Sequence, residues 1–192
     1  MSTRYISTQG FDRSKRNALS LHQHLQGYPL TAKSFIRVDN NLRVYWHTLF
    51  DLCPELLKLD PPEGEDLFRG FMRFAISRNV PLDWTLHLNL YRWLQRSPYA
   101  AGLQEEHLEA VLAAAASLWC DNDTGEHAGI ALVHRDSTLV VTGWKAAGRR
   151  GGSTLEVLQP EGRPITPGDF AFLRLPQRPY SLESNFDALP DI

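Results

Sequence analysis

The sequence predicts an α+β protein, in which an N-terminal helical region of about five helices packs with a C-terminal antiparallel β-sheet of about four strands. Two observations indicate this class. Apolar residues recur at helical spacing up to about residue 125, and β-branched runs separated by turn residues follow. The expected division is a helical region over 1–125, a β region over 126–180 that forms one compact unit with the helices, and a frayed acidic tail over 181–192.

The first two expected helices lie on either side of a break at "GYPLTAKSFIRV". The first spans 12–26, and the second begins after Asp39 or Asn40 as its N-cap. Pro54 falls inside the apolar stripe of the second helix, so a kink or break is expected there. The stripe consists of Leu42, Tyr45, Leu49, Leu52 and Leu56.

Three more helices are expected before the sheet. One covers 65–78, the next begins at Asp83 as its N-cap, and the last lies within "AAGLQEEHLEAVLAAAASLW". The middle one is apolar on more than one side, which is typical of a central helix. The four alanines at 113–116 in the last helix allow a close approach to a neighbour. The inward face expected for 65–78 consists of Leu67, Phe68, Phe71, Met72 and Ala75.

Four strands are expected after residue 128, in meander order. They are "AGIALVH", "TLVVTGW", "STLEVLQ" and "DFAFLRL". The residues "RDS" form a hairpin turn between the first two strands. The connection before the last strand contains Pro160, Pro164 and Pro167. Proline cannot donate a backbone hydrogen bond, so this connection is not expected in the interior of a β-sheet.

Composition indicates an ordinary globular protein. Of the 192 residues, 43% are hydrophobic and 22% are charged. No apolar run reaches the roughly 18 residues of a membrane span, and the N-terminus lacks the apolar stretch of a signal peptide. We therefore expect a cytoplasmic protein in which Cys53 and Cys120 are reduced thiols.

Charge is distributed in blocks of alternating sign. The net charge is −2, which gives no overall field for nucleic acid. Residues 1–38 carry +5 and 39–66 carry −5, whereas 67–96 carry +4 and 97–128 carry −6. These blocks are consistent with solvated helix faces or with patches that bind a charged partner.

The stretch "SLWCDNDTGEHAGIALVHRD", residues 117–136, combines a thiol, two histidines and four acids. His127 and His134 are seven residues apart, so a strand places them on opposite faces. A calcium loop requires glycine at position six, but Gly125 comes one place early and Leu132 stands at position twelve. We therefore predict a turn between a helix and a strand, with no metal and no cofactor.

A thiol enzyme is the alternative interpretation of this region. "HAGIALV" resembles the histidine-bearing strand of papain-like amidases. The resemblance implies a hydrolase or transferase that uses a Cys53–His127 pair. Cys53 precedes Pro54 at a helix start, where a thiol pKa can be depressed. However, "FDLCPELL" lacks the Asp-Cys-Ser-Gly-like motif that carries the nucleophile in that family.

A basic loop, "AAGRRGGS", follows the second expected strand. It does not match a phosphate-binding loop, although its arginines and backbone could contact a phosphate. We expect Trp144, Lys145, Arg149 and Arg150 to form an exposed patch at one end of the sheet that binds an acidic protein surface. The favoured function is a protein-interaction module, such as a bacterial adaptor, chaperone or toxin-neutralising (immunity-like) partner. The partner and the oligomeric state stay open.

Overall fold

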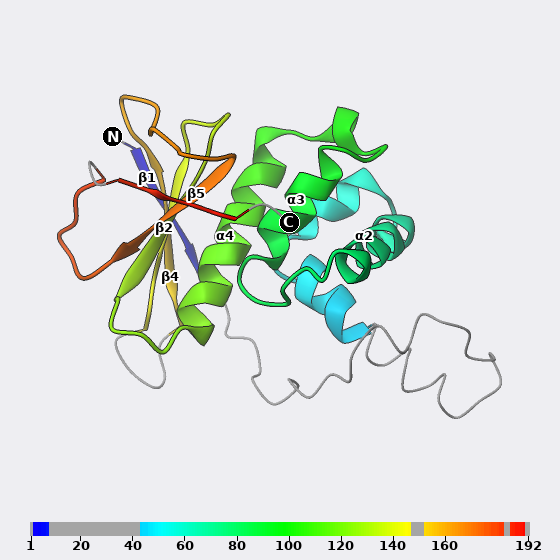
Figure 1. Cartoon of the computed structure of the whole chain (residues 1–192), viewed down its shortest axis with the longest axis horizontal. Helices are drawn as coiled ribbons and strands as arrows, with labels where there is room; N and C mark the ends of the chain where they lie inside the picture. The colour runs from blue at the N-terminus through cyan, green and yellow to red at the C-terminus, as the bar shows by residue number, and fades with distance from the viewer. Residues whose placement is uncertain (1, 8–42, 147–151, 183–184, 191–192) are drawn as a thin grey trace. The chain divides into compact units, whose positions relative to one another are not determined.

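The computed structural model describes residues 2–7, 43–146, 152–182 and 185–190 (Figure 1). It confirms the α+β class. The chain forms two compact units, one over Phe11–Val80 and one that combines Met1–Gly10 with Pro81–Ile192. The boundary between them therefore falls at residue 80, and the last helices belong with the sheet. The expected helix over 12–26 and the expected caps Asp39 and Asn40 lie outside the described residues.

The unit over Phe11–Val80 is helical in its described part. A helix covers 43–50, a 3-10 helix η3 covers Pro54–Leu59, and α2 covers Glu65–Ser77. The expected break at Pro54 is confirmed, because Pro54 opens η3 rather than continuing the preceding helix. The buried face of α2 is the predicted one. Asp60 accepts a hydrogen bond from the Leu67 backbone at 2.9 Å, which satisfies an amide in the first turn.

The other unit places two helices beside the sheet. They are α3, Leu86–Leu94, and α4, Glu105–Asn122, with the 3-10 helix η4, Ala100–Gly102, between them. The predicted N-cap, Asp83, is wrong by two residues, because Thr85 is the N-cap of α3; the Asp83 carboxylate instead accepts hydrogen bonds from the Thr85 backbone and hydroxyl in the turn before the helix. At the start of α4, His107 Nδ1 accepts from the Gln104 N–H at 3.0 Å. No helix in the described part of the chain is long and apolar enough to cross a membrane.

The sheet has six antiparallel strands in the order β1-β4-β3-β2-β5-β6. The four expected strands are present. Two more, β1 and β6, were not predicted. The bounds are Ser2–Ser7 for β1, Gly129–His134 for β2, Val140–Trp144 for β3, Thr154–Gln159 for β4, Phe170–Leu175 for β5 and Asp187–Ala188 for β6.

The predicted meander order is wrong for β5. This strand pairs with β2, through registers such as His134↔Phe170, instead of with β4. The N-terminal strand β1 explains the difference, because it pairs along the whole outer edge of β4. β5 instead pairs at the opposite edge of the sheet, beside β2. The proline-rich connection before β5 carries the chain back to that edge, where the Arg135 N–H donates to the Asp169 carbonyl.

The two faces of the sheet are covered by different parts of the unit. Gly143 faces α4, since a Cβ atom there would lie 2.9 Å from Cys120 Sγ and 3.0 Å from Ala116 Cβ. Alternation along β3 turns Trp144 to the opposite face. There the C-terminal segment supplies the cover, because Tyr180, Leu182 and Phe186 pack against the core of that face.

The tail differs from the frayed segment that the sequence predicted. Phe186 and Leu189 are buried, β6 pairs with β5, and the Leu189 N–H donates to the Phe170 carbonyl. Phe186 belongs to the core of the sheet face that carries Trp144, and β6 covers part of the edge of β5. The described part of the tail crosses the sheet (Figure 1), and its Leu189 and Pro190 carbonyls accept hydrogen bonds from Arg92 on α3.

Candidate protein-binding surfaces

The Cys53–His127 pair does not have the properties that a thiol enzyme needs. Cys53 is fully buried, and burial, followed by the charge of Glu55, raises its pKa well above the ordinary value. A nucleophilic thiol needs the opposite shift. His127 is exposed and belongs to the other compact unit. Cys53 and Cys120 are thiols that form no disulfide, and burial also raises the pKa of Cys120 to about 12.

The acidic stretch that follows α4 is a turn, as predicted. Asp123 Oδ2 accepts hydrogen bonds from the Gly125 N–H at 3.0 Å and from Lys145 Nζ at 2.6 Å. Lys145 also donates to the Gly125 carbonyl and lies 4.8 Å from the centroid of the Trp119 ring. Within the described ranges, no group of three or more His, Cys, Asp or Glu side chains could hold a metal ion.

The expected exposed patch at Trp144 and Lys145 is wrong for both residues. Trp144 is buried beneath Arg178 and Tyr180, and Lys145 is half-buried in its ion pair with Asp123. The C-terminal segment covers Trp144, and nothing near Trp144 in the sequence indicates this cover. Arg149 and Arg150 lie outside the described residues.

A polar cluster lies on the sheet face that carries Trp144. Glu156 on β4 is buried, with Oε2 at 3.4 Å from both the Thr142 hydroxyl and the Trp144 indole nitrogen. Arg178 Nη2 donates to Glu156 Oε1 at 2.6 Å. Burial raises the pKa of the Tyr180 hydroxyl, and the negative charge of Glu156 also acts in this direction. The C-terminal segment therefore contacts the sheet through charge as well as through apolar packing.

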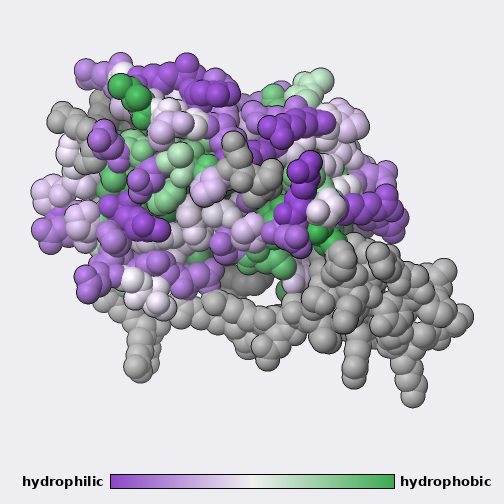
Figure 2. Space-filling view, in the orientation of Figure 1, coloured by the Kyte–Doolittle hydropathy of each residue, from purple (hydrophilic) through white to green (hydrophobic). Residues whose placement is uncertain are grey.

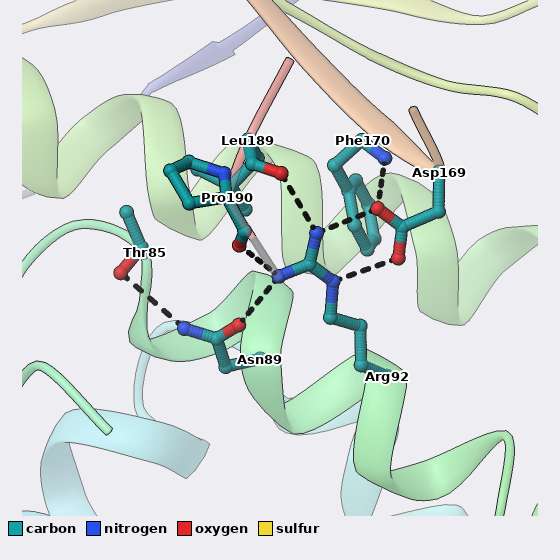
Figure 3. A network of polar contacts seen from close by, with 7 residues as sticks. All are labelled: Thr85, Asn89, Arg92, Asp169, Phe170, Leu189 and Pro190. Carbon is teal, nitrogen blue, oxygen red and sulfur yellow. Dashed lines mark hydrogen bonds and ion pairs between the residues drawn. The ribbon is translucent and has the colours of Figure 1, made fainter. Parts of the chain in front are cut away.

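A second charged cluster ties α3 to the tail (Figure 3). Five hydrogen bonds join the Arg92 guanidinium to the Asp169 carboxylate, the Asn89 side chain and the carbonyls of Leu189 and Pro190. The contacts to Asp169 are bidentate, at 2.7 and 2.6 Å. Burial acts to raise the pKa of Asp169, but hydrogen bonds from Arg92 and the Phe170 N–H, with the positive charge of Arg92, hold it below its ordinary value. Arg92 is thus buried with its donors satisfied.

Sequence reasoning missed Arg92, Asp169, Glu156 and Arg178. A signal existed for two of them. Arg92 is a charge within the otherwise apolar helix "LHLNLYRWL", and Glu156 is an acid inside the buried strand "TLEVLQ". Buried charges are rare unless they are paired. Their partners are 77 and 22 residues away, so the sequence pattern did not identify them.

Two large apolar side chains are exposed among the described residues, Ile165 at 91% and Leu82 at 50%. Ile165 lies in the connection between β4 and β5, close to Arg163. Asp136 in the β2–β3 turn is 3.8 Å from both Arg135 and Arg163, so the turn and the connection are neighbours. Figure 2 shows a small hydrophobic spot surrounded by hydrophilic surface at this end of the sheet. We call Arg135, Arg163 and Ile165 the loop surface.

Comparison with protein families gives a match over most of the chain. Residues 25–190 match the family model described as "Methanobactin biosynthesis cassette protein MbnC-like". No curated protein matches the chain. The matched region contains most of the chain, including α2, α3, α4 and strands β2 to β6. The chain therefore belongs to the MbnC-like family.

Proposed function

We propose that this chain is a protein-binding subunit of a biosynthesis cassette and that it contacts another protein of that cassette through the loop surface. The family description supports the first half of the proposal, because it names a biosynthesis cassette. Of the roles that the sequence suggested, an adaptor agrees best with this description. The thiol-enzyme alternative receives no support from the buried Cys53.

The exposure of Ile165 carries the proposal. Its side chain is 91% exposed, far more than that of Leu82. Single exposed apolar residues are common on monomers, so position matters as well as exposure. Pro164 precedes Ile165 and Pro167 follows two residues later, which restricts the backbone of this connection. A restricted loop loses little conformational entropy when its apolar side chain enters a pocket.

The charges around Ile165 indicate the chemistry of the partner. The exposed Arg135 and Arg163 share one carboxylate, since both lie 3.8 Å from Asp136. A partner pocket that is apolar at its centre and acidic at its rim would complement both features. The sequence suggested an acidic partner for a patch around Trp144. The proposal keeps the acidic partner but assigns its binding to the loop surface.

The test is complex formation with the other proteins of the same cassette. Each is co-expressed with the full-length chain, and complexes are measured by size-exclusion chromatography with light scattering and by calorimetry. Ile165→Asp should weaken binding at least about tenfold, because an ionised group would enter an apolar pocket. Leu82→Asp, a charge introduced at the other exposed site, should leave the affinity unchanged. Equal affinity of the Ile165→Asp variant and the wild type would refute the role of the loop surface.

A further inference from the structure

The segment 176–182, "PQRPYSL", lies on the sheet in a way that resembles a bound peptide. It follows β5, forms turns and irregular chain rather than a strand, and packs Tyr180 and Leu182 on the face that carries Trp144. Its contacts with Glu156 and Trp144 come from two side chains that are spaced two residues apart, Arg178 and Tyr180.

The groups beneath Arg178 suit a guanidinium. Its Nη2 lies 2.6 Å from Glu156 Oε1, and its Cζ lies 4.4 Å from the centroid of the Trp144 ring. A carboxylate at the fork and an aromatic ring under the plane are the two partners that a guanidinium binds best. The Tyr180 ring packs on the same indole, with the centroids 5.0 Å apart.

The two residues of the Arg178–Glu156 ion pair differ in solvent exposure. The Glu156 side chain is 8% exposed, whereas that of Arg178 is 49% exposed. Thr142 and Trp144 lie beside the second carboxylate oxygen of Glu156, and all three residues belong to paired strands. The carboxylate is thus held in place by the sheet, whereas Arg178 is half in water on an irregular segment. Another guanidinium could replace Arg178 without a rearrangement of the strands.

We propose that Thr142, Trp144 and Glu156 form a binding site for an arginine side chain of a partner protein, and that Arg178 and Tyr180 occupy this site as an intramolecular mimic. The ligand is a peptide segment with arginine followed two residues later by an aromatic residue. We call Thr142, Trp144 and Glu156 the arginine site. It shares no residue with the loop surface proposed above. A tethered mimic acts at an effective concentration of about millimolar, so the partner must compete with it.

The experiment uses the full-length chain and the synthetic peptide acetyl-PQRPYSL-amide. Binding is followed by the NMR signal of the Trp144 indole N–H and by calorimetry. The Arg178→Ala, Tyr180→Ala double variant should bind the peptide at least about tenfold more tightly than the wild type, because the tethered competitor is gone. Adding Glu156→Gln to that variant should abolish binding, and a peptide with lysine in place of arginine should bind more weakly.

Arg174→Ala is the matched control. Arg174 is also exposed and also lies over an aromatic ring, at 5.2 Å from the Phe172 centroid, but the contact is away from Glu156. This variant should bind the peptide as weakly as the wild type. If the double variant does not fold, Arg178→Ala alone retains Tyr180 and gives the same comparison.

Three results would overturn the proposal: equal peptide affinity of the wild type and the Arg178 variants, undiminished binding after Glu156→Gln, or no saturable shift of the Trp144 signal. An Ile165→Asp chain should bind the peptide normally. A failure of the loop surface and a failure of the arginine site are therefore distinguishable.

Discussion

Replacement of Arg92 by methionine tests whether the buried charge cluster anchors the tail. The Arg92 side chain is 6% exposed and donates hydrogen bonds to Asp169, Asn89 and the carbonyls of Leu189 and Pro190. Methionine fills a similar volume but leaves Asp169 without its counter-charge. Removal of one member of a buried ion pair costs about 3–5 kcal/mol, and the partly exposed Asp169 can regain water, so we expect about 3 kcal/mol.

Two measurements detect this loss. With a urea dependence of about 2 kcal/mol/M, a loss of about 3 kcal/mol lowers the unfolding midpoint by about 1.5 M. Hydrogen exchange locates the effect, because the Leu189 N–H donates to the Phe170 carbonyl and depends on the anchored tail. Its exchange should accelerate by about a hundredfold.

Arg135→Met is the matched control in the same compact unit. Arg135 is 64% exposed and lies 3.8 Å from Asp136, so its loss should change stability by less than about 1 kcal/mol. If Arg92→Met and Arg135→Met shift the urea midpoint equally, or if the Leu189 amide keeps its protection in Arg92→Met, the cluster does not anchor the tail.

Two further predictions concern the helix–sheet contact and acid stability. Gly143→Ala should destabilise the protein by about 1–3 kcal/mol, because the new methyl group would overlap Cys120 and Ala116. Gly162→Ala, which meets no atom within 4 Å, should change stability by less than about 0.5 kcal/mol, and equal urea midpoints for the two variants would contradict the close packing of α4 on β3. Burial lowers the pKa of His134 below its ordinary value of 6.5, and its Nδ1 accepts a hydrogen bond from the Asp136 N–H, so the fold prefers the neutral ring. The stability from this preference is complete above pH 6.5 and decreases as the pH falls below it, since the unfolded chain then binds more protons. His134→Gln should therefore reduce the difference in urea midpoint between about pH 7.5 and about pH 5.5, and an unchanged difference would show that His134 does not contribute.

Local sequence patterns predicted the helices and strands in which buried residues recur at a regular spacing. The apolar stripe of α2 and the positions of β2 to β5 were predicted, because side-chain periodicity is set by each element's own geometry. The break at Pro54 and the turn at Asp123 also follow from the local chemistry of proline and aspartate.

Features that depend on contacts between distant parts of the chain were not predicted. The place of β5 depends on which sheet edge is free, and β1 occupies the edge that a meander would use. The burial of Trp144 depends on a segment more than thirty residues later in the sequence. The residues of the arginine site were missed for the same reason, since an acid in a strand does not identify the cation that pairs with it.

The two arginines hold the C-terminal segment in physically different ways. Arg92 is buried and binds two backbone carbonyls near the end of the chain, so its release would expose several unsatisfied groups. Arg178 is half exposed and already partly hydrated, so its own desolvation is small, but its release leaves the buried Glu156 carboxylate without a counter-charge. Exchange of Arg178 for another guanidinium therefore restores the pairing of Glu156, and it does not involve β6 or the Arg92 cluster. An arginine of a partner could then reach the Glu156 carboxylate while the sheet stays folded. Arg178 and a partner's arginine can therefore exchange at this site without loss of the fold.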